Sequence, residues 1–323
     1  MGDQLGSETY LLQRGGQILA GRYRVTELLG VGAMGSVWLA EQMALKTIVV
    51  VKFHEEGFVG SKAEVALERF LREARTIASV RHRNVCELYE VGRTEEGEPY
   101  LIMERLDGGS LAARLRDEGR LPVGESLAIA IALCHGLEAV HAAGVLHRDI
   151  KPENVFLHED RELGVVPKLI DFGLARPAGD EKRITSNGKA VGTPGYMAPE
   201  QARGQRDLDA RADLYAVGVT LYEMLSGELP ARGETSMDLM VWTATEDPIP
   251  LAEHRPDLAG PVTDAVMKAL AFPRPGRYED ARSMRLALEA VYEAHRSGAI
   301  GAVRATGRGA REPAPTMPEP DDG

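Results

Sequence analysis

The hydrophobic pattern of the chain changes at "DGG", residues 107–109. Before this point, short runs rich in valine, such as "YRVTELLG" and "KTIVVVKF", are bounded by glycine and predict β-strands. After it, longer runs such as "ESLAIAIALCHGLEAVHAAG" predict helices, and this one is apolar on almost every side, as buried core helices are. The change predicts an α+β fold with a strand-rich lobe followed by a mainly helical lobe.

One amphipathic helix interrupts the strand-rich part. In "SKAEVALERFLREARTIASV", residues 61–80, apolar side chains recur at helical spacings, and Ser61 could cap the helix. The apolar positions are Val65, Phe70, Ala74, Ile77 and Val80. We therefore expect a small, mostly antiparallel sheet with one main helix.

These patterns divide the chain into four parts. Residues 1–21 lack a clear period and are predicted to be a leader, and residues 22–106 form the strand-rich lobe. Residues 107–296 form the helical lobe. Residues 297–323 are rich in Gly, Ala, Pro and Arg, with almost nothing to bury, and are predicted to be a disordered tail.

Charge and hydropathy exclude several kinds of partner. The formal net charge of −11 disfavours nucleic acid, because phosphate binding usually needs a basic face. No run approaches eighteen uncharged apolar residues, and the N-terminus lacks the basic start and apolar middle of a signal peptide. We expect no membrane span in this chain and a cytoplasmic location.

The chain has two cysteines, Cys86 and Cys134, and both lie among apolar residues. Two reduced, buried thiols are the favoured interpretation. The alternative is a metal site that adds His135 and His141 to Cys134, but no second Cys pair accompanies them.

Three glycines lie close together in "LGVGAMGSV", residues 29–37. Gly30, Gly32 and Gly35 have no Cβ, so the backbone there can approach a ligand and present N–H groups to phosphate oxygens. A dinucleotide-binding fold needs a helix after such glycines, but the strand-like "SVWLAEQ" follows here. A flexible glycine hairpin over phosphates fits better, and a plain hairpin turn is the alternative.

A lysine, Lys52, lies fifteen residues after Val37 inside the apolar run "IVVVKF". A lysine in such a strand is costly to bury unless it is paired. It either points to solvent at a sheet edge or faces the glycines and needs an acidic partner. Glu73 in the middle of the helix is the candidate partner, although a solvated glutamate is equally compatible with its position.

A polar octet, "HRDIKPEN" at residues 147–154, interrupts the apolar run "GVLHRDIKPENVFL". It sets a carboxylate, an ammonium group and an amide beside residues that look buried. Seventeen residues after Asn154 comes Asp171, the first residue of "DFG". The plain alternative for the octet is a polar turn between two helices.

With these motifs, the chain resembles a eukaryotic-type protein kinase catalytic domain over roughly residues 22–290. The motifs occur in the family's order: the glycine loop, Lys52, Glu73, Asp149, Asn154, Asp171, Glu200 in "APE", Asp213 and Arg277. The resemblance implies the bilobal protein kinase fold, with ATP bound between the lobes. Its composition suggests a bacterial member of the family.

The resemblance also implies roles in phosphoryl transfer. Asp149 would orient the attacking hydroxyl and accept its proton, and Lys151 would offset the charge that develops. Asn154 and Asp171 would bind Mg²⁺, with Mn²⁺ as the alternative metal. Lys52 and Glu73 would form an ion pair that positions the α- and β-phosphates.

For the nucleotide, Met103 would be the gatekeeper, and the backbones of Glu104 and Leu106 would face the purine. The remaining residues implied in ATP binding are Leu29, Gly30, Val31, Gly32, Ala33, Met34, Gly35, Ser36, Val37, Val50 and Lys52.

The segments "DIKPEN" and "GTPGYMAPE" resemble the branch of the family that is specific for serine and threonine. Thr193 would form a hydrogen bond near Asp149 and Lys151. Glu200 would pair with Arg277 in a buried ion pair. Protein substrates with Ser or Thr acceptors are therefore expected, and a pseudokinase or nucleotide-binding scaffold without turnover is the alternative. A small-molecule kinase is disfavoured by the second segment.

Arg148 precedes Asp149, as it does in relatives whose activation loop is ordered by phosphorylation. We predict autophosphorylation in the loop 171–200, with self-association in trans as one route. Thr185, Ser186 and Thr193 are the candidates, and Thr185 or Ser186 is favoured because both lie mid-loop beside basic residues.

Overall fold

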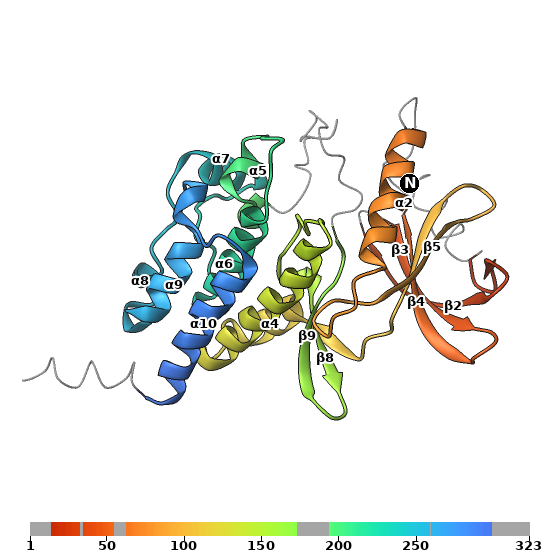
Figure 1. The fold of residues 1–323 in the computed structure, drawn as a ribbon, viewed down its shortest axis with the longest axis horizontal. Coiled ribbons are helices and arrows are strands. Elements are labelled where there is room, and N and C mark those ends of the chain that lie inside the picture. The colour runs from red at the N-terminus through yellow and green to blue at the C-terminus, as the bar shows by residue number, and fades with distance from the viewer. Residues whose placement is uncertain (1–13, 33–34, 55–62, 173–193, 259, 299–323) are drawn as a thin grey trace, which may run out of the picture.

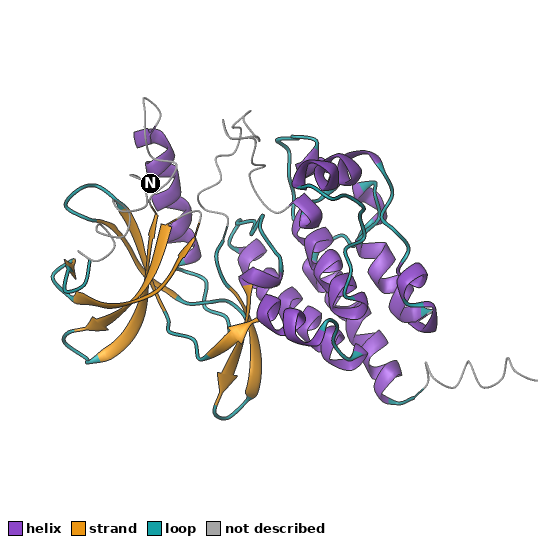
Figure 2. Ribbon diagram, turned by 180° about the vertical axis from the view of Figure 1, so that it is seen from behind, coloured by secondary structure: helices purple, strands orange, loops and turns teal. Residues whose placement is uncertain are grey.

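The computed structural model describes residues 14–32, 35–54, 63–172, 194–258 and 260–298. Most strands gather at one end of the molecule together with the helix α2, most helices lie at the other end, and a small second sheet lies between them (Figures 1 and 2). The predicted α+β architecture of two lobes is confirmed.

The strand-rich lobe contains a six-stranded antiparallel sheet in the order β1-β2-β3-β4-β6-β5. Its strands are β1 (Ile18–Leu19), β2 (Tyr23–Gly32), β3 (Gly35–Gln42), β4 (Thr47–His54), β5 (Leu88–Arg93) and β6 (Pro99–Met103). In β4 the side chains of Val49, Val51 and Phe53 are buried, while Val50 and Lys52 alternate with them and are half-buried. This alternation places Lys52 on the opposite face from the core that Trp38, Tyr100 and Ile102 help to form.

The predicted helix is α2 (Ala63–Ile77), which packs on β5. Phe70, Ala74 and Ile77 are buried against Leu88 and Leu101, as the helical period requires. The prediction was wrong for Val65 near the start of the helix, because this side chain is 64% exposed. Val80 is buried but lies beyond the end of the helix, and Ser61 lies outside the described residues.

The predicted leader is wrong for its last residues. Strand β1 pairs with β2, and Arg14 is buried with its guanidinium 2.7 Å from the Glu98 carboxylate and above the Phe53 ring. A two-residue strand has no readable period, and burial of an arginine depends on a partner far along the chain. Residues 1–13 lie outside the described part.

The helical lobe begins with a three-stranded antiparallel sheet in the order β7-β8-β9. Its elements are β7 (Gly108–Ser110), α3 (Leu111–Glu118), α4 (Val123–Ala142), η1 (Pro152–Asn154), β8 (Val155–Asp160), β9 (Gly164–Leu169), η2 (Pro194–Tyr196), α5 (Pro199–Ala202), α6 (Arg211–Ser226), α7 (Ser236–Thr245), α8 (Leu251–His254), η3 (Pro256–Leu258), α9 (Pro261–Ala269), η4 (Arg274–Gly276) and α10 (Ala281–Arg296). The glycines of "DGG" lie in β7, which pairs closely with β8. Gly108 has no room for a side chain, because a Cβ there would lie 2.2 Å from the Leu157 carbonyl oxygen, and its φ of +123° favours glycine.

Helix α4 is long and apolar enough, by length and composition, to cross a membrane. Half of that stretch is buried, and the helix packs against α6 and α10 in the core of the helical lobe. This is the arrangement expected of the buried core helix that the sequence predicts.

Candidate active site

The start of the polar octet is hydrogen-bonded to a buried carboxylate, Asp213, on α6. One oxygen of Asp213 accepts hydrogen bonds from the His147 N–H (2.9 Å) and the His141 ring (2.8 Å), and the other accepts from the Arg148 N–H (2.8 Å). Burial alone would raise the pKa of Asp213, but the His141 hydrogen bond and neighbouring donors hold it below its ordinary value. Sequence reasoning placed Asp213 in the motif order without a role, although an Asp inside the apolar helix "RADLYAVG" is the signal for one.

The backbone of the octet is strained at Arg148, whose φ is +62°. The same Asp213 carboxylate binds the N–H groups on this residue and on the one before it. Asp213 therefore stabilises a turn that a non-glycine residue rarely adopts.

The octet is tied to the segment that carries Asp171. The buried His147 ring forms a 3.1 Å hydrogen bond with the Ile170 carbonyl and packs on the Phe172 ring, with 4.7 Å between centroids. The Ile170 N–H donates to the Asn154 carbonyl at 2.9 Å. These contacts bring Asn154 and Asp171 to one site from two separate motifs.

Within the octet, the Asn154 amide nitrogen donates to the backbone oxygen of Asp149 (2.7 Å) and to its carboxylate (3.0 Å). Lys151 Nζ lies 3.7 Å from the same carboxylate. The structure thus brings Asp149, Lys151 and Asn154 together as predicted. The Asp149 side chain keeps 12% of its surface exposed.

Lys52 pairs with Asp171, and the predicted ion pair between Lys52 and Glu73 is not formed. Lys52 Nζ lies 2.7 Å from Asp171 Oδ1, with the two side chains 13% and 34% exposed. The left-handed backbone at Asp171, with φ +54°, accompanies this position of the carboxylate. Glu73 is half-buried on α2, whose packing through Phe70 and its neighbours holds the helix on β5.

The glycine-rich segment forms the predicted hairpin between β2 and β3, with Gly32 opposite Gly35 and Gly30 opposite Val37. A Cβ on Gly30 or Gly32 would meet no atom within 4 Å, so this side of the hairpin is open. Gly35 has φ +134°, which only glycine adopts readily. Strand β3 follows directly, as the sequence predicts.

The other predicted nucleotide residues lie on the hairpin itself or on the neighbouring strand β4. Val37 is opposite Lys52 in the sheet and is half-buried, as is Val50, which is opposite Met103 on the next strand. Leu29 and Val31 are more than half exposed, and Ser36 is buried. Ala33 and Met34 lie outside the described residues.

The linker after β6 carries the two residues that are predicted to face the purine, Glu104 and Leu106. In the described part of the chain, neither the Glu104 carbonyl nor the Leu106 N–H has a hydrogen bond, so both groups can bind a ligand. Met103 and Leu101 line a small cavity of about 30 Å³ beside Lys52 and Asp171.

Magnesium fits the donors that the structure brings together. Asn154 and Asp171 offer oxygen ligands, and Mg²⁺ is usually held by one or two such groups together with substrate phosphates. Among the described residues, no group of three His, Cys, Asp or Glu side chains could hold a metal. Cys86 and Cys134 are buried, unpaired thiols, and burial raises the pKa of each.

A histidine that the sequence analysis missed, His54, lines the same small cavity. It is 4% exposed and packs edge-on against Phe70, and neither ring nitrogen has a hydrogen-bond partner in the part of the chain that is described. Burial, and then the Lys52 ammonium, lower the pKa of His54 to about 4. Its position two residues after Lys52 in a strand was the available signal.

This depressed pKa predicts a pH-dependent stability. The unfolded chain binds the His54 proton below pH 6.5 and the folded chain only below about pH 4, so stability is lost as the pH falls through this window. We expect His54 to account for about 2 kcal/mol of the loss between pH 7.5 and pH 5. Urea unfolding of wild type and His54→Leu at pH 7.5 and pH 5 measures this loss, because the free energy of unfolding of the variant should fall by about 2 kcal/mol less between the two pH values. An equal fall in the free energy of unfolding for the two proteins would contradict the assignment of this loss to His54.

Glu200 and Arg277 form the predicted buried ion pair. The two guanidinium NH groups lie 2.7 and 2.8 Å from the two carboxylate oxygens, and the side chains are 4% and 0% exposed. Arg277 also donates to the Ala271 carbonyl and lies over the Tyr215 ring. In contrast, Thr185, Ser186 and Thr193 lie outside the described residues.

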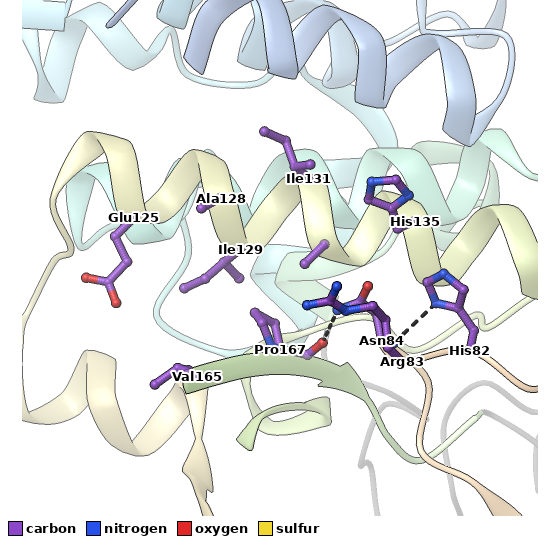
Figure 3. A pocket seen from close by; sticks show the side chains of 11 residues that line it. His82, Arg83, Asn84, Glu125, Ala128, Ile129, Ile131, His135, Val165 and Pro167 are labelled. Atoms are coloured by element: carbon purple, nitrogen blue, oxygen red, sulfur yellow. Dashed lines mark hydrogen bonds between the residues drawn. The ribbon is translucent and has the colours of Figure 1, made fainter. Parts of the chain in front are cut away.

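A larger hollow, of about 520 Å³, contains none of the predicted site residues. It lies between α4, β9 and the segment 82–84, with an apolar floor that includes Ile129 (Figure 3). Among its polar lining residues, Asn84 is already engaged within the fold, because its side chain donates to the Pro167 carbonyl and its backbone N–H to the His82 ring.

Comparison with known proteins agrees with this geometry. A family model described as "Protein kinase domain" matches residues 23–265. The serine/threonine-protein kinase pkn3 of Myxococcus xanthus is 35% identical over 281 residues, 85% of this chain and 51% of that protein. PknB of Mycobacterium leprae is 33% identical over 282 residues, 85% of this chain and 43% of that protein. The chain therefore spans about half the length of the curated relatives it matches.

Among solved structures, the PknI kinase domain of Mycobacterium tuberculosis superimposes with a TM-score of 0.67 at 28% identity. The match covers 85% of this chain and 98% of that one.

Proposed function

Because the chain belongs to the protein kinase family, we propose that it transfers the γ-phosphoryl group of ATP to serine and threonine hydroxyls of protein substrates. One observation carries the proposal: the Ile170–Asn154 hydrogen bond links the segment of the Asp149–Asn154 pair to the segment of Asp171, which pairs with Lys52. We assign residues 22–106 to the ATP-binding lobe and 107–296 to the catalytic lobe, with activity in the cytoplasm, where ATP is supplied.

Asp149 orients the acceptor hydroxyl and takes its proton, and the Lys151 ammonium beside it offsets charge on the transferred group. Asn154 and Asp171 hold magnesium, which neutralises phosphate charge when it is bound. Manganese is the alternative ion. The open hairpin at Gly30 and its neighbours covers the phosphates through backbone N–H groups.

The Lys52–Asp171 ion pair has to be exchanged for catalysis. Lys52 is committed to Asp171 here, yet each of the two groups has its own task in binding ATP. We propose that Asp171 turns to the metal and that Lys52 then binds phosphate and Glu73. If the ion pair instead persisted with nucleotide bound, the chain would be a nucleotide-binding scaffold without turnover, which is the second candidate function.

A transfer assay decides between the two functions. With γ-labelled ATP, Mg²⁺ and a generic basic protein, we expect label on serine and threonine of the substrate. We also expect its complete loss when the divalent cation is chelated. ATP binding without transfer to any acceptor, including the chain itself, would support the scaffold.

The same incubation without substrate tests self-modification. We propose that the chain phosphorylates Thr185 or Ser186, two hydroxyls beside Lys182 and Arg183, through self-association in trans. Mass spectrometry should locate the label in residues 171–200 and show incorporation that rises more than linearly with protein concentration. An active protein left unmodified in that region would contradict this.

A further inference from the structure

Glu104 is the first residue after β6, and all but one of its polar groups are engaged. Its N–H donates to the Glu87 carbonyl at 2.9 Å, and Oε1 accepts from the Glu87 N–H at 2.7 Å. The Lys168 ammonium lies 2.7 and 2.9 Å from the two carboxylate oxygens. Among the polar groups of Glu104, the backbone carbonyl alone has no hydrogen bond to the described part of the chain.

The Lys168–Glu104 ion pair is largely removed from water. The two side chains are 10% and 15% exposed, although 64 residues separate them in the sequence. Exposed ion pairs are weak and mobile, but a desolvated carboxylate that accepts three hydrogen bonds from two donor groups has one favourable position. The backbone on either side of Glu104 is therefore fixed in orientation.

Lys168 lies on β9, the strand that leads to Asp171, so its ion pair connects the linker to this strand. On β9, the Leu169 N–H donates to the Asn84 carbonyl and the Leu169 carbonyl accepts from the Cys86 N–H, both at 2.9 Å. The Asn84 side chain adds a 2.8 Å bond to Pro167 (Figure 3). The linker, the segment around Asn84 and β9 form one hydrogen-bonded unit that ends at Leu169, two residues before Asp171.

We propose that Lys168 and Glu104 are a pair of positioning residues that orient the linker so that the Glu104 carbonyl and Leu106 N–H meet the purine. This rests on the proposed function, because it takes ATP to lie against the linker. A carbonyl and an N–H held in place bind a base without a further loss of conformational entropy. Without the pair, the linker has to be ordered by the ligand, and affinity for the base falls while phosphate binding remains.

A purely structural pair would behave differently. Its loss would lower the melting temperature and the fraction of active protein, and the folded remainder would bind ATP normally. The positioning role instead raises KM for ATP with little change in kcat, and it affects only ligands that carry a base.

The test uses the full chain, with Mg·ATP and magnesium tripolyphosphate as paired ligands in calorimetry, together with KM and kcat. For Lys168→Met we expect binding of ATP about ten-fold weaker and binding of tripolyphosphate within two-fold of wild type. Glu104→Gln keeps an acceptor for Glu87 and Lys168, so the loss should be about three-fold. Arg105→Met is the control, because it breaks an exposed ion pair with Asp107 on the same linker and should change neither affinity.

ATP affinity at the wild-type level in folded Lys168→Met would overturn the proposal. If that variant does not fold, unchanged ATP affinity in Glu104→Gln overturns it instead. Equal losses for ATP and tripolyphosphate would also overturn it, since the effect would not concern the base. Failure of the wild type to bind ATP would refute the proposed function itself, which is a separate outcome.

Discussion

Replacing Asp149 by Asn should lower kcat by about 10²- to 10⁴-fold while the affinity for ATP stays within two-fold. The substitution removes the group that accepts the hydroxyl proton but preserves the shape of the site. The hydrogen bond from Asn154 to the backbone oxygen of residue 149, at 2.7 Å, does not depend on the carboxylate. Steady-state transfer to a protein acceptor, paired with calorimetric ATP binding, measures both quantities.

The matched control is Glu153→Gln, which neutralises an exposed carboxylate in the same octet. Its kcat should stay within two-fold of wild type. Transfer by Asp149→Asn at the wild-type rate would show that the proton goes elsewhere. An equal fall in both variants would point to the net charge of the loop as the cause.

The second large effect concerns stability. Arg277→Met should lower the free energy of unfolding by about 3–5 kcal/mol, because it leaves the Glu200 carboxylate buried without its partner. This corresponds to a fall in melting temperature of roughly 6–20 °C. Differential scanning calorimetry on the full chain measures it.

Adding Glu200→Gln to Arg277→Met removes the unpaired charge, so the double variant should regain a part of the lost stability. As a control, Arg22→Met breaks a pair whose arginine is 58% exposed and should shift the melting temperature by less than about 2 °C. A double variant less stable than Arg277→Met would mean that the carboxylate alone is not the source of the loss.

Much of this architecture was predictable because it depends on local pattern. The valine-rich run before Lys52 predicted the strand, and glycines with a strand after them predicted the hairpin. The orientation of Lys52 was left open in the sequence and is given by the alternating burial along β4. The Glu200–Arg277 pair came from the family resemblance, and the structure bears it out.

The features that were missed depend on contacts between distant residues. Lys52 and Asp171 pair across 119 positions of the chain, and no residue pattern around "DFG" reveals that contact or the left-handed backbone at Asp171. Lys168 and Glu104 meet only because the fold brings β9 next to the linker after β6. His54 looked like an ordinary strand residue, because its lack of partners is visible only in three dimensions.

The bonds between Asn84, Cys86 and Leu169 also bear on how the two lobes can move. Residues 84–86 precede β5 in the sequence, yet they are bonded to β9, and Val85 packs beside Val140 of α4. A Cβ on Gly136 of α4 would lie 2.8 Å from the Asn84 carbonyl oxygen, so this contact leaves no room for sliding. If the two lobes move apart, residues 84–86 should move together with the helical lobe, and the hinge should fall at the end of α2, near Ile77. Hydrogen exchange would then be slow at the Cys86 amide and faster along the last turn of that helix.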